Sequence, residues 1–147
     1  MESTIERLEH LLEQGRQYLA KADPNALMIR PDSEKWSKKE ILGHLLDSAV
    51  NNLKRFTEIQ FSEGPYLIVP YNQKGLVTAN NYQAAELGEL SNFWLAINQR
   101  IIQLMKHQTD TTLAYPILQP DGSPADLRFL MVDYVDHLAY HVRQIVA

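Results

Sequence analysis

Hydrophobic residues recur at intervals of three and four along four long stretches of the chain, with polar residues between them. This interval is that of one face of an α-helix, so each stretch predicts an amphipathic helix. The predicted helices are residues 4–22, Ser37–Phe61, Tyr82–His107 and a last segment that follows Ser123. The first of them should stop at Asp23-Pro24, because proline cannot continue a helix.

Local signals mark the starts of three of these helices. In a capping box, a serine before the first turn and a glutamate three residues later bond the free N–H groups of that turn. Two pairs fit this pattern, Ser3 with Glu6 and Ser37 with Glu40. For the last helix we expect Ser123 to be the N-cap, because Pro124 then occupies the first helical position that proline favours.

The segments between the predicted helices are short, with one exception. About twenty residues, 62–81, separate the second helix from the third, and connections of this length are usually functional or disordered. Their apolar run, Tyr66–Val69, favours packing against the rest of the molecule. Leu113–Leu118 predicts a short extended strand, and Asp121-Gly122 predicts a tight turn after it.

Four long helices without a convincing sheet predict an all-α protein, a four-helix bundle with a long loop between its second and third helices. A length of 147 residues suits one domain, so we expect residues 1–147 to form a single bundle. In such bundles, binding and metal sites are built from side chains on facing helices. Candidate site residues should therefore lie near the borders of the apolar helix faces.

Composition narrows the possible functions. Hydrophobic residues make up 45% and charged residues 22%, which is typical of a folded globular protein. The net charge is -4 and the basic residues are scattered, so we expect no nucleic-acid partner. The chain has no long apolar run and no export signal at its start, so we expect a cytoplasmic protein without membrane contact. Because cysteine is absent, any thiol must come with a substrate.

Histidine supplies the candidate chemistry. The stretch HLAYH places His137 and His141 one helical turn apart at the border of the apolar face of the last helix, so that both can bind one ion. On the second helix His44 lies just outside the apolar face. The pair alone is weak evidence, since border histidines also bridge core and solvent. His10 and His107 fit ordinary surface positions.

Several stretches resemble the DinB/YfiT superfamily. KWSKKEILGHLLDSAVNNLKRF, with His44 eight residues after Trp36, looks like the second helix of that family, and DYVDHLAYHVRQI is similar to its last helix. VPYNQ resembles a loop segment of the YfiT-like branch. The resemblance implies an up-down-down-up four-helix bundle, often a homodimer. It also implies a divalent metal, zinc or nickel, held by His44, His137 and His141.

Three protein ligands leave a coordination position open, and two chemistries then fit. A metal-bound low-molecular-weight thiol can attack an electrophilic small molecule, which is the thiol S-transferase activity that the resemblance implies. Alternatively, metal-bound water can hydrolyse an ester or amide, with Asp47 or Asp133 as general base. Either carboxylate could instead orient an imidazole.

Two further alternatives stay open at the level of sequence. Tyr71 can donate a hydrogen bond to a metal-bound ligand, or it can anchor the long loop. A non-catalytic bundle that binds a small molecule fits the same residues.

Overall fold

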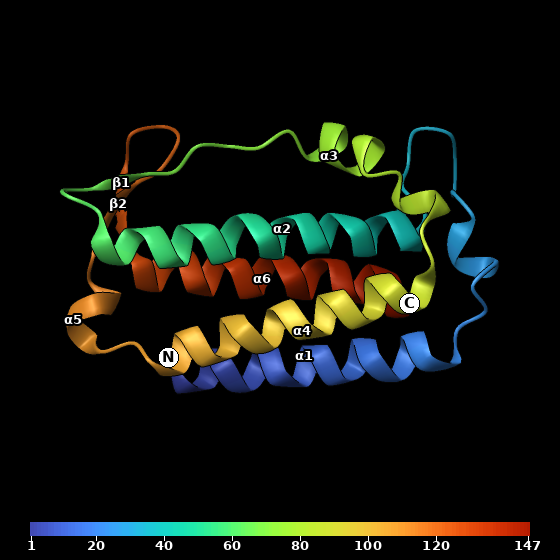
Figure 1. Cartoon of the computed structure of the whole chain (residues 1–147), viewed down its shortest axis with the longest axis horizontal. Helices are drawn as coiled ribbons and strands as arrows, with labels where there is room; N and C mark the ends of the chain where they lie inside the picture. Colours follow the sequence, from blue (N-terminus) through green and yellow to red (C-terminus); the bar gives the residue numbers. More distant parts are fainter.

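Four long helices lie side by side in the computed structural model, which describes residues 1–147. They are α1 (Glu2–Lys21), α2 (Lys38–Glu58), α4 (Leu87–Lys106) and α6 (Leu127–Val146). The helices α4 and α6 each pack against both α1 and α2, so α1 and α2 lie diagonally across the bundle. In Figure 1, α1 and α6 run in one direction, while α2 and α4 run in the other. This confirms the up-down-down-up bundle.

The capping box predicted for α2 is present, but the one predicted for α1 is wrong. Ser37 accepts a hydrogen bond from the backbone N–H of Glu40, whose side chain accepts one from the backbone N–H of Ser37. The helix α1 instead begins at Glu2, with Met1 as its N-cap and without a side-chain cap. Since the Met1 carbonyl accepts from the N–H of Ile5, the first turn forms before Ser3 could act as a cap.

A small three-stranded sheet closes one end of the bundle and corrects the expectation that no sheet is present. Its strands are β1 (Tyr66–Leu67), β2 (Pro116–Leu118) and β3 (Pro124–Asp126). The order is β1-β2-β3, with β1 parallel to β2 and β3 antiparallel to it. The sheet joins the connection after α2 to the segment before α6, two segments far apart in sequence (Figure 1).

The predicted start of the last helix is wrong. Pro124 lies in β3, and Asp126 is the N-cap of α6, accepting a hydrogen bond of 2.8 Å from the N–H of Phe129. Ser123 instead donates to the carboxylate of Asp121 within the turn. The predicted strand 113–118 is shorter than expected, because Leu113 ends the short helix α5 (Asp110–Leu113).

The long connection between α2 and α4 is ordered. After β1 it forms α3 (Gln73–Ala79), which packs along α2, and then the 3-10 turn η3 (Tyr82–Ala84). Two further 3-10 turns flank α2, η1 (Ala26–Met28) and η2 (Ile59–Phe61). The predicted third helix therefore starts at Leu87 rather than at Tyr82. The reason is tertiary, because the Tyr82 ring packs against α2 and its hydroxyl donates to Asp47.

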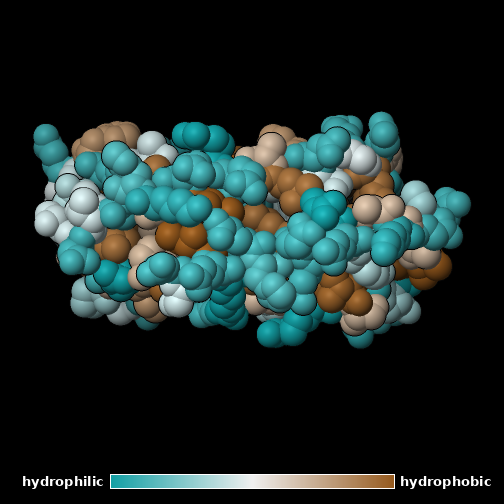
Figure 2. All heavy atoms as spheres, turned by 90° about the horizontal axis from the view of Figure 1, so that it is seen from below, coloured by the Kyte–Doolittle hydropathy of each residue, from teal (hydrophilic) through white to brown (hydrophobic).

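The apolar faces of the four helices form one core. A cluster of 29 buried hydrophobic residues includes Trp94, Phe56 and Leu8, each at most 1% exposed. On the face drawn in Figure 2, hydrophobic side chains form small areas that hydrophilic ones separate. None of the helices combines the length and the apolar character that a membrane crossing requires.

Gly43 allows the close approach of Tyr82 to α2, and this predicts the effect of a substitution. In a helix interior, glycine to alanine normally stabilises by about 0.5–1 kcal/mol. A methyl group at Gly43 would overlap the Tyr82 ring and lie 2.8 Å from its Cβ atom. We therefore expect Gly43→Ala to lower the free energy of unfolding by about 2 kcal/mol, measured by urea denaturation.

Gly88→Ala is the matched control, because a methyl group there meets only the flexible end of Glu86, at 3.3 Å. It should be neutral or stabilising. If Gly43→Ala behaves like this control, the packing of Tyr82 on α2 is not as described.

Candidate metal centre

His44, His137 and His141 meet where α2 packs against α6. One helical turn separates the two histidines of α6, and the antiparallel neighbour α2 brings His44 opposite them. The ring centroids are 5.0 Å apart for His44 and His137, and 4.7 Å apart for each of the other two pairs. The three imidazoles thus form a nearly equilateral triangle.

The nitrogen atoms of this triangle are spaced so that they can hold one ion. The Nε2 atoms of His44 and His137 are 3.1 Å apart, and one nitrogen from each histidine lies within 4.8 Å of the others. Two nitrogens bound to a tetrahedral zinc ion at about 2.0–2.1 Å are roughly 3.3 Å apart. The His44–His137 separation is close to this value, and three imidazoles are a donor set that a divalent metal ion can use.

Burial keeps the imidazoles neutral. His44 has no exposed surface, so it lies deeper than the border position that its helical face predicts. Burial, followed by the nearby His141 and His137, lowers the pKa of His44 to about 4. Burial and His141 lower the pKa of His137 to about 4, and burial lowers that of His141. At neutral pH all three rings have a lone pair for a metal.

The His141 ring is held by a hydrogen bond, whereas the Nδ1 atom of His44 has no hydrogen-bond partner. His141 Nδ1 lies 2.7 Å from the side-chain oxygen of Gln144, so its N–H donates there and leaves Nε2 free for a metal. The Nδ1 atom of His44 is buried without a partner. Trp36 covers His44, with ring centroids 4.9 Å apart. The opposite edge of the His44 ring faces the site, with Nε2 at 3.1 Å from Nε2 of His137.

Asp47 lies one turn from His44 but is engaged elsewhere. One of its oxygens accepts from the Tyr82 hydroxyl at 2.6 Å and from the Asn80 amide at 3.3 Å. Burial raises the pKa of its carboxyl, and the bond from Tyr82 opposes part of that rise. These contacts make Asp47 a fastening point for the long connection, while its other carboxylate oxygen is buried without a partner.

A cleft of about 550 Å³ opens beside His137, between α2, α6 and the long connection. We refer to it as the His137 cleft. Its lining includes Ser48, Asn52, Arg55, Tyr71, Asp133 and His137. Asp133 is exposed on its wall, one turn before His137. Tyr71 is half-buried, and burial, which outweighs Ser48 and Arg55, raises its pKa. Tyr71 therefore stays protonated at neutral pH and can donate a hydrogen bond.

A second hollow, of about 700 Å³, is lined by Trp36, His141 and Gln144. Gln144, which lines this hollow, is bonded to the Nδ1 atom of His141. The His137 cleft also holds Tyr71 and Asp133, so it is the better candidate for a reacting molecule.

The two histidines outside the triangle lie where the sequence places them. His10 and His107 are both exposed. Sequence reasoning gave no role to Gln144 or to Trp36 beside the histidines. For Gln144 the sequence did contain a signal. It stands three residues after His141, so on a helix its side chain can reach back to the imidazole.

The buried histidines predict that the metal-free protein loses stability in acid. On folding, the pKa of His44 and His137 falls from 6.5 to about 4. The unfolded chain therefore binds more protons between these values. The free energy of unfolding should be retained above pH 6.5 and fall as the pH drops toward 4, by on the order of 3 kcal/mol for a fully buried ring.

Urea denaturation with a chelator, at about pH 7 and about pH 5, measures how steeply the free energy of unfolding changes with pH. His137→Gln should flatten this slope, whereas His10→Gln at an exposed position should leave it unchanged. Equal slopes in the native chain and in His137→Gln would contradict the prediction.

Comparison with known proteins supports the fold. Curated protein sequences give no match. Among solved structures, YfiT from Bacillus subtilis, described as a probable metal-dependent hydrolase with an unusual four-helix bundle topology, is 21% identical with a TM-score of 0.86. The match covers 98% of this chain and 82% of YfiT.

A mycothiol-dependent maleylpyruvate isomerase is 10% identical with a TM-score of 0.76, covering 99% of this chain and 60% of the isomerase. At these identities the two structures show a shared fold. The model of the DinB superfamily matches residues 2–145 of the sequence. The chain therefore belongs to the DinB superfamily and has the YfiT-like four-helix bundle.

Proposed function

We propose that this protein is a divalent-metal-dependent enzyme that transfers a low-molecular-weight thiol to an electrophilic small molecule. The observation that carries the proposal is the triangle of neutral imidazoles, one of which, His137, lines a cleft. Three protein ligands are typical of catalytic zinc sites, whereas structural sites use four. The absence of cysteine fits a nucleophile that arrives with a cosubstrate.

Zinc or nickel at the three histidines would act as a Lewis acid that favours the thiolate form of a bound thiol at neutral pH. In the overall transfer, the S–H proton passes to solvent and the sulfur forms a bond to the electrophilic carbon. The leaving group departs with the electron pair of its broken bond. The protein has to orient both molecules and exclude competing water.

Side chains of the His137 cleft suit these tasks. Tyr71 keeps its proton at neutral pH and can donate to the atom on which negative charge develops. Arg55 holds Tyr71 in place, with its guanidinium 5.3 Å from the ring centroid. The likeness to an isomerase that depends on mycothiol supports thiol chemistry on this fold, as an analogy between folds.

A metal-dependent hydrolase is the second candidate. Asp133 favours it, because its carboxylate lines the same cleft as His137 and is free of ion pairs. A carboxylate near metal-bound water can serve as general base. The likeness to YfiT, a probable metal-dependent hydrolase, supports this alternative in the same way.

The first test combines metal content with thiol conjugation. We expect near-stoichiometric zinc or nickel in untagged protein, measured by elemental analysis, and its loss in His44→Ala and His137→Ala. Conjugation of a thiol to a chromogenic electrophile should fall at least about 100-fold in both variants. His10→Ala, at an exposed position, is the matched control and should keep metal and activity.

Persistence of full activity in His137→Ala would contradict a metal mechanism. The hydrolase would be the correct function if the protein turns over model esters with metal but without any thiol. In that case Asp133→Asn should reduce the turnover. Tyr71→Phe should lower kcat about tenfold or more, with little change in metal content, if its hydroxyl stabilises developing charge.

A further inference from the structure

We infer that Arg55 binds a carboxylate at the far end of an elongated thiol substrate whose sulfur lies at the three histidines. This inference rests on the proposed thiol transfer and adds to it the shape and charge of the thiol. It comes from an arginine in the His137 cleft that has no carboxylate partner in the protein.

Arg55 lies on the same face of α2 as His44. Eleven residues separate them (55 - 44 = 11), which is three turns of helix plus about 20°. At about 1.5 Å per residue, the two Cα atoms are roughly 16 Å apart along the helix axis. The His137 cleft is thus lined by one member of the metal-binding triangle, His137, and by the Arg55 guanidinium farther along α2.

The contacts of Arg55 hold the guanidinium while leaving donors free. Its Nη2 atom donates to the backbone carbonyl of Val69 at 2.7 Å, and its plane lies over the Tyr71 ring. A guanidinium has five N–H donors, and a carboxylate is the planar acceptor that such a fork binds best. Arg55 is the one arginine or lysine that lines this cleft.

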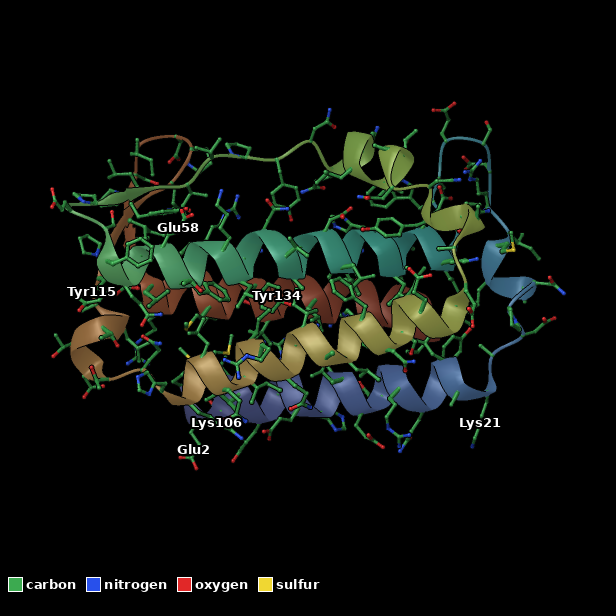
Figure 3. All side chains as sticks on the ribbon, in the orientation of Figure 1. Glu2, Lys21, Glu58, Lys106, Tyr115 and Tyr134 are labelled. Carbon is green, nitrogen blue, oxygen red and sulfur yellow. The ribbon has the colours of Figure 1, made fainter.

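The nearby carboxylates are engaged or lie across the cleft. Glu58, at the sheet end of α2 in Figure 3, accepts from the Tyr66 hydroxyl at 2.7 Å and pairs with Lys54 at 3.8 Å. Asp136 pairs with Arg7. Asp133 lies on the opposite helix, α6, without a partner. The charge of Arg55 is therefore available to a ligand, and Asp133 can accept from a hydroxyl or ammonium group of that ligand.

The cleft lining is mixed in polarity. Ser48 and Asn52 stand on α2 between His44 and Arg55, and Ile68, Phe129 and Leu130 add apolar surface to the same cleft. Such a lining suits a ligand that carries amide or hydroxyl groups beside apolar ones. To join the triangle to Arg55, the ligand must span roughly 10–16 Å, the length of about three to five extended residues of a peptide. A short thiol such as a mercaptoacid cannot reach both ends.

Cobalt-loaded protein provides a binding test that does not depend on turnover, because a thiolate bound to cobalt gives a charge-transfer absorption band. The probes are N-acetylcysteine and its extensions by one, two and three glycines, each as free acid and as C-terminal amide. For the two longest probes, we expect the free acid to bind about tenfold more tightly than the amide. N-acetylcysteine itself should show no such preference.

The variants assign the effect to Arg55. In Arg55→Gln the preference for the free acid should vanish, and in Arg55→Lys it should be intermediate, because lysine keeps the charge but loses the fork. Lys54→Gln removes one positive charge from the exposed neighbouring position and should retain the full preference. Cobalt content and circular dichroism establish that each variant is folded and loaded.

Two outcomes overturn the inference in different ways. If Arg55→Gln keeps the preference, or N-acetylcysteine shows it equally, the carboxylate does not bind Arg55, although thiol binding at the histidines stands. If no thiol changes the cobalt spectrum of the native chain, the proposed thiol transfer fails and this inference fails with it.

Discussion

The antiparallel packing of α2 against α6 is the constraint on which the rest of the site depends. It brings His44 to two histidines that lie 93 residues later in the chain (137 - 44 = 93). It also removes the imidazoles from water, which keeps them unprotonated and ready to bind a metal. The up-down-down-up order makes this pairing possible, because it sets the second and last helices side by side. Tyr134, inside the bundle in Figure 3, donates to Asn98 of α4 at 2.6 Å and ties a third helix to the pair.

Much of the fold could be predicted because helix periodicity is a local property. The four long helices, the capping box of Ser37 and the long connection all follow from neighbouring residues. The errors occurred where local signals competed or where distant contacts decided. Ser123 and Asp126 are both good caps, and the pairing of β3 with β2 selects Asp126. Tyr82 fits a helix by pattern, but its contact with Gly43 places it in a separate turn.

In the candidate site, too, local patterns could be predicted from the sequence and contacts between distant segments could not. Spacing pointed to His137 and His141, the pattern of the second helix offered His44, and the family resemblance joined the three in one site. A helical wheel placed His44 at a border, although it is fully buried, because a wheel does not include Trp36 and the connection that cover α2. The partners of Asp47 and Arg55 come from the long connection, whose path over α2 depends on contacts with distant segments. Such contacts leave little trace in the local pattern.

The long connection is fastened at both ends to parts of the molecule other than the histidines. One end pairs with β2 through β1, and the other is held by Tyr82 on Asp47. Between these two anchors, residues 68–73 form part of the cleft wall without contributing to the ligand triangle. Substitutions in this part of the cleft wall can therefore occur without changing the metal ligands. Within one such scaffold, evolution can exchange the molecules that are accepted while the metal chemistry beneath them is kept.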